Sequence, residues 1–316
     1  MVIIDKTWEA KVNLKGVHFL LSYQCTAECD HCFVWGSPFL KGTFSLKDVE
    51  LILREVKKLK SVESVCFEGG EPFLHYPIMI ESLQKAKRMG FKLVVVTNCY
   101  WATSFDNALQ WIRPVAEIGV DELDLSADLY HGESLASPEV VNAIKVLKRF
   151  KIPFNIFCTE ENPKAVKRRI AGTSFSCGKV VHKGRAAVEL TRKAKGKKSK
   201  SLGWREFTEC KEEDIKNPSR VHVDPLGYVH VCQGISIGNF KKRPLSEIIK
   251  SYNPEKHPIL GSLLEGGPVR LAQKYRVSHR HKYTDACHFC YDLRVSLRKR
   301  FPEILAPGQM YGEGSN

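Results

Sequence analysis

The sequence lacks a long apolar run. No stretch approaches the ~18–20 consecutive apolar residues that a membrane-crossing helix needs. The first residues, Met1 to Trp8, also lack the basic-then-apolar order of a secretory signal peptide. We therefore expect a cytoplasmic protein with no membrane segment. Its 316 residues, 43% of them hydrophobic, are enough for one large domain, or a large domain with a small companion.

Acidic residues are scarce relative to basic ones. The chain has 35 Asp and Glu against 49 Lys and Arg, a formal charge of +14, which favours anionic partners such as an acidic peptide or a nucleic acid. Much of the excess lies in residues 192–200 and 294–300. Residues 195–201 have no interleaved aromatic side chains on which bases would stack. We interpret both basic segments as solvated surface and do not expect a nucleic-acid partner.

The cysteines lack the even count of a complete disulfide framework. There are 11, an odd number, and cytosolic thiols stay reduced. Three of them lie in the stretch Cys25-Thr-Ala-Glu-Cys29-Asp-His-Cys32, after an apolar run, residues 17–23, that predicts a strand. Three thiolates can hold three irons of a cubane cluster and leave the fourth iron open. Zinc is the alternative, although a structural zinc site needs four ligands, usually as two pairs.

The C-x3-C-x2-C spacing directly after a first strand resembles the radical S-adenosylmethionine (radical SAM) superfamily. The resemblance implies a 4Fe–4S cluster held by Cys25, Cys29 and Cys32, with the amino and carboxylate groups of SAM on its open iron. It implies that an electron from the cluster cleaves SAM to methionine and a 5′-deoxyadenosyl radical. It also implies a partial (β/α)6 TIM-like barrel and a reductant such as ferredoxin or flavodoxin.

Strand and helix patterns alternate from Val17 to about Arg185, independently of that resemblance. The expected strands are residues 17–23, 64–67, 91–96, 120–125, 153–158 and 175–181. The expected helices are residues 46–59, 77–89, 104–118, 138–150 and 163–170. Ser45 is placed to cap the first helix and Gly119 to end the third. Six such units with short connections predict an α/β fold with a parallel sheet and right-handed crossovers.

The residues after the second strand match a second motif of the family. Chemistry in such barrels collects at the carboxyl ends of the strands. There the chain reads Gly69-Gly70-Glu71-Pro72, and by resemblance to the family's GGE motif this edge binds the SAM amino group. Two glycines allow a ligand to approach the backbone closely, and a nearby carboxylate suits an ammonium group.

Polar residues follow the third and fourth strands as well. The resemblance implies that Asn98, Ser126 and Asp128 contact the SAM ribose or carboxylate, with ordinary strand-end capping as the alternative. His131 is a candidate acid or base on the substrate side, or a structural loop histidine. Cys158 and Cys177 are candidate hydrogen-atom donors, as in some radical SAM peptide epimerases, or simply small core residues.

A second cysteine set lies in the last third of the chain. The segment Gly184-Arg185-Ala186 recurs in radical SAM proteins that carry a C-terminal iron–sulfur extension. Cys210 is followed by a predicted hairpin, residues 221–232, that ends in Cys232, and later by Cys287-His-Phe-Cys290. This arrangement resembles SPASM and the shorter twitch domains, which bind auxiliary 4Fe–4S clusters. Four cysteines complete one cubane, so the count fits a twitch-type domain with one auxiliary cluster; zinc is again the alternative.

These patterns predict an organisation in two parts. Residues 1–190 form the barrel, residues 191–203 a basic linker or loop, and residues 204–316 the auxiliary domain. The gap between Cys210 and Gly227 is longer than in the family. Residues 291–301 predict an amphipathic helix, and the end of the chain, 307–308 and 312–316, reads as a frayed tail.

The expected activity is hydrogen abstraction from a substrate by a radical SAM oxidoreductase or maturase. A peptide or protein residue is the favoured substrate, in a maturation, epimerisation or crosslinking reaction, and an acidic peptide would suit the positive charge. Because the cysteine loop begins at residue 25, we expect any leader-binding domain to be a separate protein. A small metabolite or cofactor precursor is the alternative substrate. A non-catalytic iron–sulfur electron-transfer protein and a nucleic-acid-modifying enzyme are the competing classes.

Overall fold

The computed structural model describes residues 12–131, 137–159, 176–193 and 201–314, without the side chains of residues 176 and 177. Its main sheet has nine strands in the order β10-β9-β8-β1-β2-β3-β4-β5-β6. These strands are β1 (Gly16–Leu20), β2 (Ser64–Glu68), β3 (Lys92–Thr97), β4 (Glu122–Ser126), β5 (Phe154–Thr159), β6 (Ser176–Gly178), β8 (Arg220–Val223), β9 (Tyr228–Cys232) and β10 (Ile235–Asn239). The remaining strands, β7 (Leu202–Gly203) and β11 (Lys282–Tyr283), form a separate two-stranded sheet.

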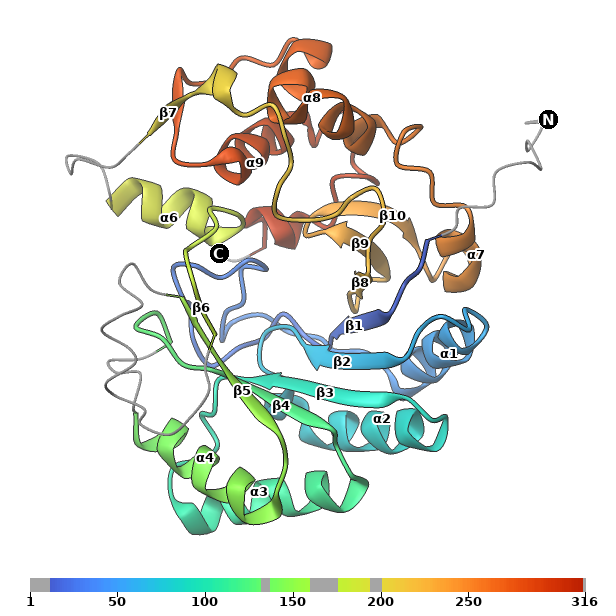
Figure 1. The fold of residues 1–316 in the computed structure, drawn as a ribbon, viewed down its shortest axis with the longest axis vertical. Helices are drawn as coiled ribbons and strands as arrows, with labels where there is room; N and C mark the ends of the chain where they lie inside the picture. The colour runs from blue at the N-terminus through green and yellow to red at the C-terminus, as the bar shows by residue number, and fades with distance from the viewer. Residues whose placement is uncertain (1–11, 132–136, 160–175, 194–200, 315–316) are drawn as a thin grey trace.

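The helices fall into two groups in chain order (Figure 1). The first group is α1 (Leu46–Lys57), α2 (Tyr76–Arg88), α3 (Phe105–Ile118) and α4 (Pro138–Phe150). The second group is α6 (Arg185–Lys193), α7 (Leu245–Lys250), α8 (Pro258–Tyr275) and α9 (Ala286–Leu297). Short 3-10 turns occupy η1 (Pro72–His75), η2 (Trp204–Glu206) and η3 (Gly308–Tyr311). None of the helices in the described ranges is both long enough and apolar enough to span a bilayer.

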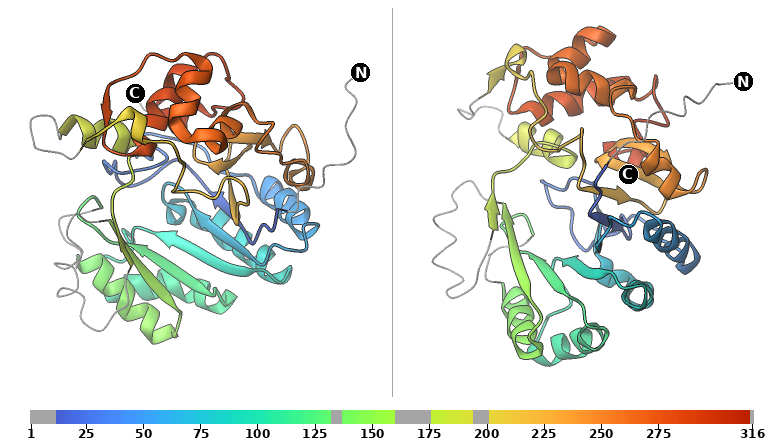
Figure 2. Two further views of the ribbon diagram at one scale, coloured as in Figure 1. Left: turned by 45° about the horizontal axis from the view of Figure 1, so that its top comes forward. Right: turned by 45° about the vertical axis from the view of Figure 1, so that its right-hand side comes forward.

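The predicted α/β fold with a parallel sheet is confirmed. Strands β1 to β6 pair in parallel, and α1 to α4 cover the outer, convex side of the curved sheet (Figure 2). The sheet is open rather than a closed barrel, because β6 and β10 are its two edges. The sixth strand is shorter than expected, and the helix predicted at residues 163–170 lies outside the described residues.

Local sequence signals explain the first half of the fold. Ser45 caps α1 by accepting a hydrogen bond from the Asp48 backbone N–H, and Gly119 ends α3 in the left-handed conformation, with φ of 76°. The apolar face of α1 is buried against the sheet, with Ile52 and Leu53 fully inaccessible to solvent. Each such aliphatic side chain contributes roughly 1.5–3 kcal/mol to folding.

The second part of the chain extends the same sheet. The predicted hairpin is present as β8 and β9, and β8 pairs in parallel with β1 from Gly16–Arg220 to Phe19–Val223. Regular structure enters the expected linker or loop, residues 191–203, from both ends. Helix α6 runs to Lys193, because residues 185–193 are mostly good helix formers and bury Ala186 and Ala187. At the other end, β7 pairs with β11.

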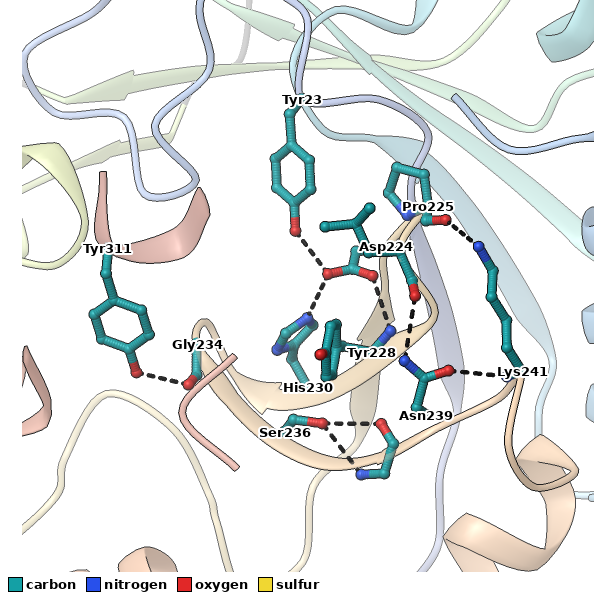
Figure 3. A network of polar contacts seen from close by, with 12 residues as sticks. Tyr23, Asp224, Pro225, Tyr228, His230, Gly234, Ser236, Asn239, Lys241 and Tyr311 are labelled. Atoms are coloured by element: carbon teal, nitrogen blue, oxygen red, sulfur yellow. Dashed lines mark hydrogen bonds and ion pairs between the residues drawn. The ribbon is translucent and has the colours of Figure 1, made fainter. Parts of the chain in front are cut away.

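The C-terminal helices complete the second group and correct two further expectations. Asp285 caps α9 through the His288 backbone N–H, so the helix begins earlier than predicted and carries both Cys287 and Cys290. The chain packs against the rest of the protein as far as η3, where Met310 and Tyr311 are buried. Tyr311 donates a hydrogen bond to the Gly234 carbonyl over 2.6 Å (Figure 3).

A buried polar network joins the hairpin to the base of the cysteine loop (Figure 3). Asp224, fully inaccessible to solvent, accepts a hydrogen bond from the Tyr23 hydroxyl over 2.7 Å and lies 3.1 Å from His230 Nε2. The Tyr228 backbone N–H donates to its other oxygen over 2.8 Å. Burial and the facing Asp224 raise the pKa of Tyr23, which keeps it a hydrogen-bond donor.

We expect Tyr23→Phe to lower the free energy of unfolding by about 1–3 kcal/mol, because it leaves a buried carboxylate with one donor fewer. Urea denaturation followed by circular dichroism measures the change. Tyr228→Phe is the matched control, since Tyr228 reaches Asp224 through its backbone and not through its hydroxyl. Equal losses in the two variants would contradict this account of the network.

Candidate active site and metal centres

The first cysteine set lies in the loop after β1. Cys25 and Cys29 are buried, and Cys32 is partly buried. Two N–H groups point at sulfur: the Gly36 backbone N–H lies 3.2 Å from Cys32 Sγ, and Asn98 Nδ2 lies 3.6 Å from Cys25 Sγ. Such donors favour a negatively charged sulfur. Burial raises the pKa of Cys25 to about 12, so these thiols release protons when they bind a metal.

The glycine pair after β2 holds this loop in place. The Gly70 N–H donates to the Ser22 carbonyl over 2.7 Å, and the Glu71 N–H donates to the Gln24 carbonyl over 2.8 Å. A Cβ on Gly70 would lie only 1.9 Å from the Gln24 oxygen. The glycines therefore allow the backbone of the cysteine loop itself to approach closely. From the sequence, we expected them to allow a ligand to approach.

The Glu71 side chain also differs from the expectation. Its carboxylate accepts hydrogen bonds from the Thr97 hydroxyl, over 2.9 Å, and from the Asn98 backbone N–H, over 2.8 Å. Glu71 is 1% exposed. Burial raises the pKa of its carboxylate to about 7, although these hydrogen bonds act to lower that pKa. Glu71 thus ties the end of β2 to the end of β3 and does not line the adjoining cavity. The motif offers that cavity the backbone of Gly69 and Gly70 instead.

A cavity of about 140 Å³ lies at the carboxyl ends of the strands, beside the cysteine loop. It brings together seven of the residues singled out from the sequence. They are Cys29, Cys32, Gly69, Gly70, Asn98, Ser126 and His131. The sulfurs, the glycine backbone and the polar strand ends therefore face one common space, which suits a ligand that touches a metal with one end and the sheet edge with the other.

Other predicted site residues stay outside that cavity. Asp128 is 2% exposed and lies 2.8 Å from His131 Nδ1, so it orients the histidine. Burial would lower the pKa of His131, but this hydrogen bond raises it to about 10. Cys158 is buried in β5, and the side chain of Cys177 lies outside the described part of the chain.

Arg185 was missed as a site residue. Its Nη1 donates to the Cys29 carbonyl over 3.1 Å and its Nη2 to the Gly36 carbonyl over 2.7 Å. Its guanidinium also lies 5.3 Å from the centre of the Trp35 ring. The preceding Gly184 has φ of 61°, and a Cβ there would lie 2.6 Å from the Cys32 carbonyl. The Gly-Arg-Ala segment was the available signal, but the sequence does not reveal what the arginine contacts.

Glu68, which also lines the cavity, is a second residue that was missed. Its Oε1 lies 2.8 Å from His18 Nδ1 on β1 and 3.0 Å from His222 Nε2 on β8. Burial would raise the pKa of Glu68, but His18 and His222 hold it well below the usual range. The wall of the cavity therefore carries a fixed negative charge on the side of β8, β1 and β2.

The second cysteine set gathers in one place. Cys232 ends β9, Cys287 and Cys290 lie one turn apart on α9, and Cys210 comes from the loop after η2. All four line a single cavity together with Lys183 and Arg294. Cys210, despite its long spacing, thus lies with the other three. Burial raises the pKa of Cys210 to about 12 and that of Cys290 to about 11.

The charges around this second cavity fit a group that is held by four thiolates. Arg294 is 2% exposed, its Nε atom has no hydrogen-bond partner, and it makes no ion pair with a carboxylate among the described residues. A buried guanidinium of this kind requires an anion. Four thiolates around a metal centre supply that charge, and the donor set fits a 4Fe–4S cluster.

The two cysteine sets are connected through aromatic side chains. Trp35, three residues after Cys32, donates a hydrogen bond from Nε1 to the Tyr291 hydroxyl over 2.9 Å. Tyr291 follows Cys290 and stacks on Tyr311, with ring centres 5.5 Å apart. The Trp35 carbonyl also accepts a hydrogen bond from Gln309 over 2.9 Å. The end of the chain therefore packs directly on the first cysteine loop.

Comparison with known families gives a match to one segment in the first half of the chain. Residues 19–160 match the model of the radical SAM superfamily, and they include the cysteine loop, the glycine motif and the polar ends of β3 and β4. The matched segment is similar to a radical SAM domain and spans less than half of the chain. Two of its three motif cysteines, Cys29 and Cys32, line one cavity together with the two glycines, as described above.

One known protein resembles part of the chain in sequence, and two solved structures resemble its fold. A protein of Bacillus subtilis (strain 168) described as a peptide biosynthesis protein, YydG, is 25% identical over 136 residues, 43% of each chain, so the match spans less than half of that relative. The structure of histidine-tagged anSMEcpe with bound AdoMet aligns with a TM-score of 0.52 at 16% identity, over 92% of this chain and 97% of that one. The structure of BtrN in complex with AdoMet and 2-DOIA aligns with a TM-score of 0.50 at 13% identity, over 80% of this chain and 88% of that one.

We expect Arg185→Gln to lose most of the iron from the first cysteine set and to keep the second set loaded. One neutral amide cannot hold the Cys29 and Gly36 carbonyls at once, as the guanidinium fork does. Iron and sulfide analysis after anaerobic reconstitution measures the loading of each set separately, on one background with the second set changed to alanine and on another with the first set changed to alanine. Arg192→Gln removes an equal charge from an exposed position of the same helix and serves as control. Full loading of Arg185→Gln would contradict the positioning role of Arg185.

Proposed function

We propose that the chain is a radical SAM enzyme that abstracts a hydrogen atom from a residue of a peptide or protein. The observation that carries the proposal is the shared cavity, where Cys29 and Cys32 face Gly69, Gly70 and Asn98 inside the matched segment. Cys25, Cys29 and Cys32 would hold a 4Fe–4S cluster, which would supply the electron for the reductive cleavage of SAM.

The protein's own part is binding, orientation and exclusion of water. The backbone of Gly69 and Gly70 is the site for the SAM amino group, and Asn98 and Ser126 are the polar contacts for its carboxylate or ribose. Asp128 acts through His131 and not by direct contact, since only His131 lines the cavity. Glu68 faces the same space and offers a fixed carboxylate to a substrate donor or cation.

The second cysteine set is proposed to bind one auxiliary 4Fe–4S cluster through Cys210, Cys232, Cys287 and Cys290. The common cavity of the four sulfurs and the unpaired charge of Arg294 support this assignment. In functional terms the chain then has a SAM-cleaving part, residues 1–190, and an auxiliary part, residues 204–316. The shared sheet and the Trp35–Tyr291 hydrogen bond join the two parts firmly.

A peptide substrate is proposed on the similarity to YydG, a peptide biosynthesis protein by description. The cleft next to the second cysteine set, about 330 Å³ in volume, is lined by Glu206, Glu209, Glu212 and Asp285. An acidic peptide would therefore meet repulsion there, and the basic surface elsewhere is the better place for one. A reductant such as ferredoxin or flavodoxin and a cytoplasmic location complete the proposal.

The test is anaerobic reconstitution, followed by iron analysis and measurement of 5′-deoxyadenosine with SAM and dithionite. We expect ~8 irons per chain, falling to ~4 when either cysteine set is changed to alanine. Deoxyadenosine should disappear only when Cys25, Cys29 and Cys32 are removed. Cys99→Ala, a buried cysteine outside both sets, is the control. Zinc in place of iron, or reduced clusters that leave SAM intact, would contradict the proposal.

The substrate class has its own test. Deoxyadenosine formation by the parent enzyme is measured with a peptide fraction and with a small-metabolite fraction of one cell extract. Stimulation by the peptide fraction, abolished when that fraction is first digested with a protease, is the expected result. Stimulation by the metabolite fraction alone would replace the peptide with a small molecule and leave the radical chemistry intact.

A further inference from the structure

We propose that the buried guanidinium of Arg294 is the counter-charge of the auxiliary cluster and raises its reduction potential. The inference rests on the proposed function, because it assumes that Cys210, Cys232, Cys287 and Cys290 hold that cluster. It assigns to Arg294 a task beyond cluster binding, namely control of how readily the cluster accepts an electron.

Among the residues that the structure describes, no carboxylate pairs with Arg294. It lies on α9, four residues after Cys290, so its side chain lies along the same helix face and lines the cavity of the four cysteines. The rings of Tyr291 and Tyr311, which stack on each other, both lie near the guanidinium, each with its centre 5.7 Å away. Within the described ranges, Arg294 contacts these rings, the Cys290 sulfur and one backbone carbonyl, and it contacts no carboxylate.

The other cations that line the cavity, Lys183 and Lys211, are different in this respect. Lys211 is exposed and lies 3.4 Å from Glu209. Lys183 also lines the cavity, but its ammonium lies 3.2 Å from Glu213, which neutralises it in place. Lys183 and Glu213 together therefore add little net charge. The charge that the cluster feels from this wall is chiefly that of Arg294.

A fixed cation at this position favours the reduced cluster. Reduction adds one negative charge to the cluster, and a nearby positive charge stabilises the reduced form more than the oxidised form. The effect is large because water is excluded: Arg294 is 2% exposed and lies beside the stacked rings of Tyr291 and Tyr311. Net charge and hydrogen bonds to the sulfurs are known levers on the potential of such clusters.

Arg294 also has a structural contact that any test must separate from its charge. Its Nη1 donates to the Gln233 carbonyl over 2.7 Å, in the turn directly after Cys232. Tyr311 holds the same turn through the Gly234 carbonyl (Figure 3). Loss of cluster in a variant would follow from a disturbed turn alone, so the decisive readout is the potential of the cluster that remains.

The experiment is a redox titration followed by electron paramagnetic resonance, on protein whose Cys25, Cys29 and Cys32 are alanine so that only the auxiliary cluster is observed. At the midpoint of the parent protein, we expect Arg294→Gln to show at least a tenfold lower ratio of reduced to oxidised cluster, a shift of about 59 mV to lower potential. Arg294→Lys keeps the charge and should titrate within about threefold of the parent ratio.

The matched control is Arg298→Gln. Arg298 is the next arginine along this face, it contacts the same Tyr311 ring, and it pairs with Glu313. Removal of its charge should leave the potential unchanged. If Arg294→Gln does not retain a cluster, Arg294→Met, with a neutral and unbranched side chain, replaces it. Loss of the cluster in both neutral variants but not in Arg294→Lys also supports the charge requirement.

Three results overturn the proposal, and the first two are distinguishable from the third. An intact auxiliary cluster that titrates at the same potential in the parent, Arg294→Gln and Arg298→Gln overturns the role of Arg294 alone. Equal loss of cluster in Arg294→Lys and Arg294→Gln has the same meaning, because the role is then structural. Zinc or no metal at these four cysteines in the parent protein overturns the auxiliary cluster itself.

Discussion

The structure depends on one constraint: a short, cysteine-rich loop must keep a single backbone shape so that its three thiols are available to the proposed metal centre. The loop has little regular secondary structure of its own, so its carbonyl groups are held by other parts of the chain. Arg185 grips two of them, at Cys29 and Gly36. The turn at Gly70 and Glu71 holds the loop's beginning through Ser22 and Gln24. A side chain at Gly70 or at Gly184, the glycines next to these two contacts, would clash with the backbone of the loop.

The same constraint explains why the second part of the chain is not an appendage. Its hairpin extends the sheet beside β1, and Asp224 of that hairpin binds Tyr23, two residues before the first cysteine. From the other side, α9 reaches the loop through Tyr291 and Trp35. Helix α9 also carries Cys287 and Cys290. One helix thus contributes both to the second cysteine set and to the support of the first.

The sequence predicted what local patterns encode. The cap at Ser45, the stop at Gly119 and the cysteine spacing each depend on residues close together in the chain, and the corresponding elements are present. Helix α8 was missed because Gly266 and Gly267 leave the helical conformation inside it and Pro268 follows, which disrupts the apolar pattern. The pairing of β8 with β1 joins residues far apart in the chain, and no local pattern records such a register.

The site residues likewise divide into those that a local pattern predicts and those that depend on contacts between distant parts of the chain. Spacing alone placed the thiols and the glycine pair near one edge, because parallel strands bring their carboxyl ends together. Spacing does not say where a side chain points, and so Glu71 and Asp128 were assigned ligand contacts although they bond to the protein. Arg185 and Arg294 act on backbone carbonyls and buried sulfurs, and such partners leave no complementary charge in the sequence to be found.

The central claim is that this chain holds two metal centres of different kinds, one open to SAM and one closed by four thiolates. The most direct measurement is electron paramagnetic resonance of the reconstituted, dithionite-reduced protein, before and after SAM is added. The account predicts two reduced-cluster signals, of which only the one that requires Cys25, Cys29 and Cys32 changes when SAM binds. A single signal, or two signals that SAM leaves unaltered, would contradict it.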